Sequence, residues 1–497
     1  MPTDLPLPSG FRIQADPDLA VRAADRVVIG GSPPRLLKLS AAGIDVVRRL
    51  LDGETVRACG AGAGAIARRL VAGGLAHPLP PAGGGPLPAE VTIAIPVRDR
   101  AADLATLLAA LDRDGTSAAV HEVLVVDDGS ADGSGGVARR AGSRVLRHET
   151  PGGPGRARET ALRAAATPVV AFLDSDVVPA VGWLDGLLAH LADPCVAAVA
   201  PRVPSRPGPS ARERYEHTHS PIDMGTRPAA ARPGARLSYV PAAALVLRRE
   251  LDGRPVGIDP SMRYGEDVDL VWRLAEAGWV IRYEPATTVT HRPRGSWPAW
   301  AAQRIDYGSS AAGLARRHPA PLRPLTGAGP TLATWLLAAA GQPVAASVVA
   351  GIVTGRLARR VARVGVEGPS VPLIAASFVA RGHLHTAHAV ADVVRRGWLP
   401  LVPLAFLTGP RATRGWVLLA VTVLPALRDY RAERPDMGVV PYGALRLVDD
   451  AAYCVGVWRG CWAERTVRPL VPAVKWPAAV AQLSSWSAFR SRIRSVV

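Results

Sequence analysis

The clearest regular pattern along the chain lies between residues 90 and 290, where short apolar runs alternate with segments of helical spacing. Val91–Val97 and Glu122–Asp128 are built around continuous aliphatic runs, and a third run ends at Leu173. Between the first two, Ala101–Leu111 repeats apolar residues at helical intervals. Continuous aliphatic strands that alternate with helices are typical of a parallel sheet covered on both faces. The pattern therefore predicts an α/β domain.

Acidic side chains follow each of these three strands. Asp99 comes after the first, Asp127 and Asp128 end the second, and Asp174 and Asp176 follow the third as Asp-Ser-Asp. In open α/β sheets, ligands bind at the carboxyl ends of the strands. An isolated Asp-x-Asp is common in surface turns, but two carboxylates at a strand end can hold Mg²⁺ or Mn²⁺ against a diphosphate. Three acidic strand ends favour a binding site over a turn.

Four motifs resemble, in order and spacing, those of the family 2 glycosyltransferases with the GT-A fold. They are Ile95-Pro96-Val97, Val125–Ser130, Phe172–Asp176 and Gly265–Leu270. The resemblance implies an α/β nucleotide-sugar transferase domain with a mostly parallel sheet. It also implies a nucleotide-diphospho-sugar as donor and a divalent metal, Mn²⁺ or Mg²⁺, as cofactor.

The same resemblance assigns the catalytic base to the acids that open the later helix. Asp267 is the candidate that accepts the proton of the acceptor hydroxyl, with Glu266 beside it. A single displacement with one base would invert the anomeric configuration. The alternative is that these acids only stabilise the first turn of a helix at Asp267–Ala277.

Further residues complete the predicted site. His291 follows a predicted strand at 281–289, and the resemblance implies that it is a third metal ligand. Mn²⁺ accepts imidazole as a ligand. The alternative is a structural role, which is more common for a lone histidine. Arginines after this strand are candidate phosphate clamps, because guanidinium groups bind phosphate bidentately. The expected nucleotide-sugar contacts are Pro96, Val97, Asp99, Asp127, Asp128, Asp174, Ser175, Arg292, Arg294 and Arg304; the metal ligands are Asp174, Asp176 and His291; the acceptor contacts are Asp223, Tyr239, Asp269 and Trp272.

Two positions depart from the family pattern. Glu159 stands where many relatives carry an asparagine after an arginine, and Arg98-Asp99-Arg100 follows the first strand where an asparagine or a polar aromatic residue is frequent. Neither removes a metal ligand or the base. Both leave the identity of the nucleotide open.

A small domain precedes the transferase domain. Residues 80–89 are a linker by their proline and glycine content, which gives domains at 1–79 and 90–320 and a third region at 321–497. In the first domain a hairpin precedes a helix capped by Ser40 and a second helix at 66–71. This winged-helix-like pattern resembles the peptide-binding domains that accompany enzymes modifying ribosomally made peptides. An ordinary stabilising subdomain is the alternative.

The chain as a whole resembles the glycosyltransferases of mycofactocin biosynthesis. Segments that carry this resemblance include Ser220–Gly225, Arg263–Arg273 and Tyr307–Ala312. It implies transfer of glucose from UDP-glucose onto a peptide-derived mycofactocin precursor, building an oligosaccharide on a redox cofactor. Two alternatives are a membrane-associated cell-wall or lipid-linked glycosyltransferase and a non-catalytic peptide-binding scaffold. The intact acidic motifs argue against the scaffold.

The last third of the chain is apolar with helical patterning. Residues 324–355 carry no charge and are long enough to span a bilayer, which takes ~20 apolar residues, but they include Gln342 and Pro343. Arg356, Arg359 and Arg360 follow at once. Three interpretations stay open: a helical bundle packed on the transferase domain, a membrane span, or basic helices on an anionic membrane surface.

Net charge and cysteine content limit the possible partners and the cellular location of the protein. The net charge of +17 attracts nucleic acid, anionic membranes or phosphorylated ligands without choosing among them. We expect no nucleic-acid partner, because no basic block is interleaved with aromatic residues. The four cysteines show neither metal spacing nor a disulfide framework, and Met1–Gly10 has no apolar signal core. A cytoplasmic enzyme is expected, at the inner face of the membrane if the helices touch it.

Overall fold

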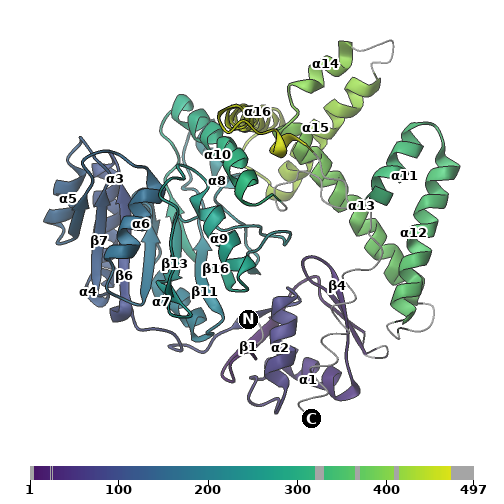
Figure 1. Cartoon of the computed structure of the whole chain (residues 1–497), viewed down its shortest axis with the longest axis horizontal. Helices are drawn as coiled ribbons and strands as arrows, with labels where there is room; N and C mark the ends of the chain where they lie inside the picture. Colours follow the sequence, from purple (N-terminus) through teal and green to yellow (C-terminus); the bar gives the residue numbers. More distant parts are fainter. Residues whose placement is uncertain are drawn as a thin grey trace. The chain divides into compact units, whose positions relative to one another are not determined.

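The computed structural model describes residues 5–22, 24, 26–319, 329–363, 366, 370–407 and 413–471 (Figure 1). The chain forms two compact units, one of residues 1–321 and 426–464 and one of residues 322–425 and 465–497. The region expected at 321–497 is therefore shared between the two units. Its predicted boundary at 320/321 and its last segment, 472–497, lie outside the described residues.

The first unit opens with a small domain of two short sheets and two helices. Its core joins Phe11 to Val47 and Leu50 of the first helix and Leu70 of the second. As expected, Ser40 caps the first helix, because its Oγ accepts a hydrogen bond from the amide of Gly43 at 3.0 Å. The antiparallel pairs are β1–β5 and β2–β3–β4. The elements are β1 (Arg12–Ala15), β2 (Ala20–Arg22), β3 (Val27–Gly30), β4 (Arg35–Lys38), α1 (Ala41–Leu51), α2 (Ala63–Ala72) and β5 (Ala76–Leu79).

The domain that follows is built on a mixed sheet in the order β10-β16-β11-β13-β9-β6-β7-β8, with β12 beside β16. The four strands from β9 to β8 are parallel, as the sequence predicts. Beyond them β13 runs antiparallel to both β9 and β11, so the second half of the sheet is mixed. The strands are β6 (Val91–Val97), β7 (Glu122–Asp127), β8 (Arg144–Arg147), β9 (Val169–Leu173), β10 (Val177–Pro179), β11 (Val196–Arg202), β12 (Ala229–Ala230), β13 (Ala244–Arg248) and β16 (Val280–His291), with a separate β14 (Glu250–Leu251) and β15 (Arg254–Pro255) hairpin.

Helices cover this sheet and bury its apolar runs. Alternate residues of β6, among them Ile93 and Ile95, are fully buried in one cluster with Leu107 and Leu111 of α3 and with Trp183 of α7. The helices of the domain are α3 (Ala101–Arg113), α4 (Thr116–Ala119), α5 (Ser134–Arg140), α6 (Pro154–Ala164), α7 (Trp183–Leu188), α8 (Ala211–Thr218), α9 (Glu266–Glu276) and α10 (Trp297–Arg317).

A helix from the far end of the chain completes the first unit. Helix α16 (Val439–Ala463) packs along α10. The backbones approach closely: a Cβ on Gly308 would lie 2.1 Å from the carbonyl oxygen of Tyr453, and one on Gly456 would lie 2.1 Å from that of Ile305. The absence of a side chain at both positions therefore allows this close approach.

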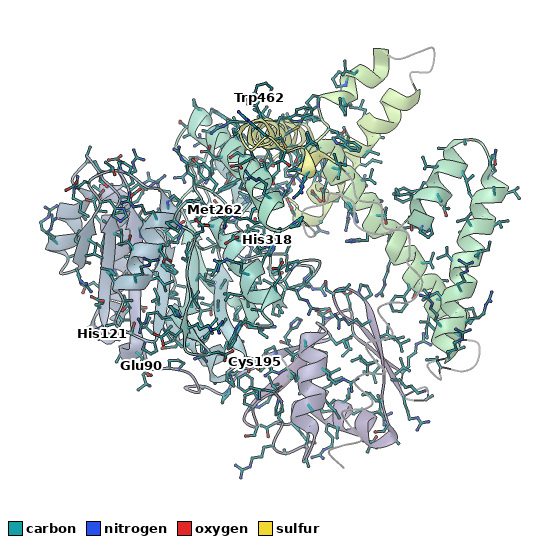
Figure 2. The ribbon with its side chains drawn as sticks, viewed as in Figure 1. Glu90, His121, Cys195, Met262, His318 and Trp462 are labelled. Atoms are coloured by element: carbon teal, nitrogen blue, oxygen red, sulfur yellow. The ribbon has the colours of Figure 1, made fainter. Side chains whose placement is uncertain are left out.

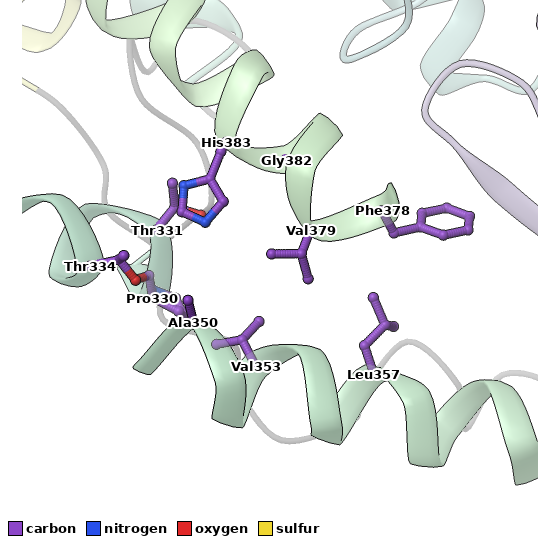
Figure 3. Close-up of a pocket in the computed structure, with 10 residues that line it drawn as sticks. All are labelled: Pro330, Thr331, Thr334, Ala350, Val353, Leu357, Phe378, Val379, Gly382 and His383. Carbon is purple, nitrogen blue, oxygen red and sulfur yellow. The ribbon is translucent and has the colours of Figure 1, made fainter. Parts of the chain in front are cut away.

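The second unit is helical. The apolar run at 324–355 is broken before Pro343, where Gly341 has a φ of 76°, so its described part forms two helices rather than one. Within the described ranges, every helix is too short or too polar to cross a membrane. Helices α11, α12 and α13 line an apolar cavity of about 250 Å³, in which Val353 and Leu357 of α12 lie across from Val379 of α13 (Figure 3). The remaining helices are α11 (Gly329–Ala339), α12 (Pro343–Arg363), α13 (Ser370–Arg396), α14 (Leu401–Leu407) and α15 (Thr413–Glu433), the last shared with the first unit.

The close packing of α10 and α16 leads to a first prediction. Gly456→Ala should lower the free energy of unfolding by about 1–3 kcal/mol, because the added methyl group overpacks the contact with Ile305. Gly443→Ala, on the same helix with no atom within 4 Å of its Cβ, should instead gain up to about 1 kcal/mol from helix propensity. Urea unfolding of both variants checks this. Shifts of the same sign would contradict it.

Candidate active site

The Asp-Ser-Asp motif lies in the turn between β9 and β10. The amide of Asp174 donates to the carbonyl oxygen of Ala243 at 2.9 Å, which fixes the turn against the start of β13. Strand β10 pairs with the end of β16, with Val177 opposite His291. This pairing places His291 Nε2 3.6 Å from Asp176 Oδ2. Two of the three side chains predicted as metal ligands, Asp176 and His291, are therefore neighbours, and Asp174 comes two residues before Asp176 in the same turn.

These three side chains fit a divalent metal by their chemistry. Carboxylate oxygens suit Mg²⁺ and Mn²⁺, and imidazole suits Mn²⁺. His291 is buried, and its Nδ1 has no hydrogen-bond partner among the described residues. In the part of the chain that the structure describes, no three acidic, histidine or cysteine side chains are already arranged around a common metal position.

Basic side chains surround Asp176. The Nη1 atoms of Arg100 and Arg294 each lie 3.2 Å from Asp176 Oδ2. Burial acts to raise the pKa of Asp176, but the hydrogen bond and charge of His291 and the charge of Arg100 hold it below its usual value. Arg294, predicted as a phosphate contact, therefore lies beside the predicted metal ligand Asp176. Arg100 was not among the predicted site residues. Its place just after the end of the first strand was the signal that could have identified it.

Arg158 of α6 joins the two halves of the site, and the sequence analysis did not assign it a role. Its guanidinium donates to Asp174 and to Glu266, and its side chain is 5% exposed. Burial acts to lower its pKa, but the charges of Asp174, Glu266 and Asp267 hold the pKa above its usual value. The available signal was the arginine that comes before Glu159. Glu159 itself supports the fold, because it accepts from the amide of Ile258 at 2.7 Å.

The predicted base lies at the start of α9, as expected. Gly265 is the N-cap, with a φ of 82°. Asp267 accepts hydrogen bonds from the amides of Val268 at 2.8 Å and Ala242 at 3.3 Å. Burial raises the pKa of Asp267, and the charge of Arg158 opposes that shift. A carboxylate whose pKa is raised towards neutral is better matched to accept a proton.

Glu266 is 5% exposed and more strongly perturbed. Burial raises its pKa to about 7, the charge of Asp267 acts in the same direction, and Arg158 opposes both. Tyr307 of α10 faces the same group of acids: burial raises its pKa, and the charges of Asp174 and Asp267 add to that shift. The start of α9 and the Asp-Ser-Asp turn are therefore neighbours in one acidic site.

The residues predicted to hold the nucleotide form a connected set of loops. Val97 lies opposite Asp127 in the β6–β7 pair. Asp127 accepts from the amide of Ser130 at 2.8 Å. Asp99, which has a φ of 51°, accepts from the amide of Ala131 at 2.7 Å. The strand ends that carry Pro96, Asp99 and Asp127 are thus held together.

Asp128 anchors the next loop. It accepts from the amides of Gly152 at 2.8 Å and Gly153 at 2.7 Å, and His148 Nδ1 lies 2.7 Å away. Burial acts to raise the pKa of Asp128, but the hydrogen bonds from Gly152, His148 and Gly153 hold this pKa below its usual value. Asp128 therefore shapes the loop that leads into α6 and Arg158.

Two of the arginines predicted as phosphate contacts, Arg292 and Arg304, have carboxylate partners within the chain. Arg292 donates to Asp103 of α3 at 2.7 Å. Arg304 is fully buried and pairs with Glu216 of α8 and Asp449 of α16. The ion pairs of Arg304 thus join α10 to α8 and α16. Arg292 stays beside the Asp-Ser-Asp turn, because its amide donates to the carbonyl oxygen of Asp176 at 2.9 Å.

The predicted acceptor residues are also held by internal bonds. Asp269 is 1% exposed and binds Arg273 at 2.7 Å and His318, labelled in Figure 2, at 3.0 Å. Trp272 Nε1 donates to the carbonyl oxygen of Ser238 at 2.7 Å. Asp223 accepts from Arg202 through both carboxylate oxygens. Tyr239 is half-buried.

Comparison with known proteins decides the family. Residues 92–253 match the model of glycosyl transferase family 2. The chain is 39% identical over 482 residues to the pre-mycofactocin glycosyltransferase of Mycobacterium tuberculosis, which covers 94% of this chain and 99% of that protein. This chain belongs to the pre-mycofactocin glycosyltransferase family. It is therefore a glycosyltransferase, and the alternative of a non-catalytic scaffold is set aside.

Other relatives match a shorter part of this chain or match it at lower identity. The succinoglycan biosynthesis protein ExoU of Rhizobium meliloti is 29% identical over 204 residues, or 38% of this chain and 58% of that protein. A mannosyltransferase of Pyrobaculum calidifontis, solved with GDP-mannose and Mn²⁺, overlaps 78% of this chain and 90% of its own at 19% identity. Its TM-score of 0.44 is too low to add to the fold or the function.

The raised pKa of Glu266 predicts a pH-dependent stability difference. Because the folded state keeps this proton up to about pH 7, ionisation costs wild-type stability as the pH rises from the ordinary value of 4.5 to about 7. Glu266→Gln cannot ionise, so its free energy of unfolding relative to wild type should increase across that window and level off above it. Urea unfolding between pH 4.5 and 8 measures the difference. A difference independent of pH would show that Glu266 ionises normally.

Proposed function

We propose that this enzyme transfers glucose from UDP-glucose onto the peptide-derived mycofactocin precursor and builds an oligosaccharide on it. The observation that carries the reaction type is the link through Arg158 between the Asp-Ser-Asp turn and the acids that open α9. The acceptor follows from the relative that matches nearly the whole chain. A nucleotide-diphospho-sugar donor is what an acidic turn flanked by arginines suits.

The proposed reaction is a single inverting displacement. The acceptor hydroxyl oxygen forms a bond to the anomeric carbon, the bond from that carbon to the diphosphate oxygen breaks, and the nucleoside diphosphate leaves with the electron pair. Asp267 accepts the hydroxyl proton on its carboxylate. Arg294 and Arg100 bind the diphosphate, and Arg158 holds Asp174 and Glu266 in place. Mn²⁺ or Mg²⁺ bound by Asp174, Asp176 and His291 would neutralise charge on the leaving group.

We also propose that the small domain binds the peptide part of the precursor. Its three-stranded sheet ends in β4, which pairs only with β3 among the described strands. An extended peptide can add a strand to such an edge through main-chain hydrogen bonds.

The decisive experiment combines UDP release with mass analysis of the acceptor. The enzyme is incubated with UDP-glucose and Mn²⁺ or Mg²⁺, with and without the mycofactocin precursor. Hexose additions that need both metal and precursor are expected. UDP release without any addition to the precursor would support UDP-glucose as the donor and would contradict the mycofactocin precursor as the acceptor. The membrane-associated cell-wall transferase would then be the function to test.

Loss of a metal ligand should remove turnover without unfolding the protein. Asp176→Asn should lower metal-dependent kcat by roughly 100-fold or more, because several kcal/mol of leaving-group stabilisation are lost. Asp185→Asn, an exposed acid on α7, is the matched control and should leave turnover unchanged. Steady-state rates measured against Mn²⁺ concentration test this. Normal turnover in Asp176→Asn would contradict the proposed metal site.

Replacing the base should separate binding from transfer. Asp267→Asn keeps the shape of the side chain but cannot accept the proton, so transfer should fall by about 10²–10⁴-fold. UDP affinity, measured by calorimetry in the presence of Mn²⁺, should stay within about twofold, because the variant leaves Asp174 and Asp176 intact. Unchanged transfer would move the base to another residue.

A further inference from the structure

One segment of the transferase domain connects the small domain to both halves of the site. It comprises residues 225–243 and is called the strap below. It contains β12 and enters β13. Its first residue is held because Tyr283 Oη donates to the carbonyl oxygen of Gly225 at 2.6 Å. Further along, the amide of Ala231 donates to the carbonyl oxygen of Ile281 at 2.9 Å.

The strap is tied to the small domain by ion pairs that meet at Asp16. Asp16 follows β1 and is 6% exposed. Arg227 Nη2 of the strap lies 2.9 Å from Asp16 Oδ1 and 2.9 Å from Asp18 Oδ2. His77 lies on β5, which pairs with β1, and its Nε2 lies 2.9 Å from Asp16 Oδ2. Asp16 is therefore a buried charge shared by two small-domain strands and the strap.

A second strap arginine reinforces this tie. The amide of Arg236 donates to Ser32 Oγ at 2.6 Å, and its Nη1 lies 3.9 Å from Asp16 Oδ2. The same side chain donates to the carbonyl oxygens of Arg227 and Pro228, which closes the strap onto itself. Arg232 donates to the carbonyl oxygen of Ser32 at 3.2 Å.

The other end of the strap contacts the catalytic residues directly. The carbonyl oxygen of Ser238 accepts from Trp272 of α9. The amide of Ala242 donates to Asp267 at 3.3 Å, and the carbonyl oxygen of Ala243 accepts from the amide of Asp174 at 2.9 Å. Two consecutive strap residues thus hold the proposed base and the proposed metal ligand. Only five residues separate Ala242 from Arg236, whose amide bonds the small domain.

We propose that Asp16 is a positioning residue for glycosyl transfer. Through Arg227 and Arg236 it fixes the strap, and the strap fixes Asp267 relative to Asp174. The small domain then has a role in the reaction beyond binding peptide: its docking sets the distance between the base and the donor. Misplacing reacting groups by about 1 Å can cost 10²-fold in rate. The inference rests on the proposed function for the roles of Asp267 and Asp174 and for the identity of the acceptor.

The test compares Asp16→Asn with Glu54→Gln in the full-length protein. Glu54 forms a half-exposed ion pair with Arg49 in the same small domain and is the matched control. In Asp16→Asn, kcat for transfer to the mycofactocin precursor should fall by about 10–100-fold, whereas UDP affinity in the presence of Mn²⁺ should stay within about twofold. Asp16→Glu should recover part of the rate because it keeps the charge. Glu54→Gln should change neither quantity.

A second readout does not depend on the acceptor. Amide hydrogen exchange at residues 238–243 should be faster in Asp16→Asn and in Arg227→Gln than in wild type, and unchanged in Glu54→Gln. Unchanged exchange in both Asp16→Asn and Arg227→Gln would overturn the inference even if the precursor is not the acceptor. So would wild-type transfer by Asp16→Asn, or an equal loss of UDP binding and transfer. If wild type does not glycosylate the precursor but hydrogen exchange responds as expected, the proposed acceptor is wrong. The link from Asp16 through the strap to the site would still be supported.

Discussion

The active site depends on one guanidinium among four carboxylates. Asp174, Asp176, Glu266 and Asp267 are gathered in a small volume, and bringing like charges together out of water is costly. Arg158 reduces that cost by pairing with one acid from each side. Burial still outweighs it at Glu266, whose pKa rises to about 7. The four acids therefore differ in protonation: burial raises the pKa of Asp174, Glu266 and Asp267, whereas His291 and Arg100 hold the pKa of Asp176 below its usual value.

The sheet topology explains why these acids meet. The parallel strands β6, β7 and β9 end at one edge, so Asp99, Asp127 and Asp174 follow neighbouring strands. Strand β13 runs the other way beside β9, which brings the chain before it to the same edge. The strap uses this reversal, because Ala242 and Ala243 precede β13 and bond Asp267 and Asp174. In a purely parallel sheet no strand would begin at the edge where β9 ends, so no residues like Ala242 and Ala243 would enter a strand beside Asp174.

The sequence predicted features that depend on local chemistry. The strand ends at Val97, Asp127 and Leu173 could be located because the aliphatic runs stop at charged residues. Ser40 could be located because helix caps have a residue preference. The sequence could not assign the partners of arginines. Arg304 was expected at the diphosphate, but its carboxylate Asp449 lies 145 residues further along the chain. The role of Arg158 was hidden for the same reason, since Glu266 lies 108 residues away. Periodicity carries no information about such pairs.

The pairing of Arg304 also gives the last helix a place in the catalytic unit. Arg304 and Tyr307 lie on adjacent turns of α10, and Tyr307 faces the carboxylates. Asp449 of α16 holds Arg304, Tyr215 Oη donates to the same carboxylate at 2.8 Å, and Gly456 allows the helices to touch. The support for one wall of the site thus comes from residues 439–463. A catalytic domain cut after α10 would lack this support, so the transferase is encoded across the chain rather than within the 92–253 segment that carries the family motifs.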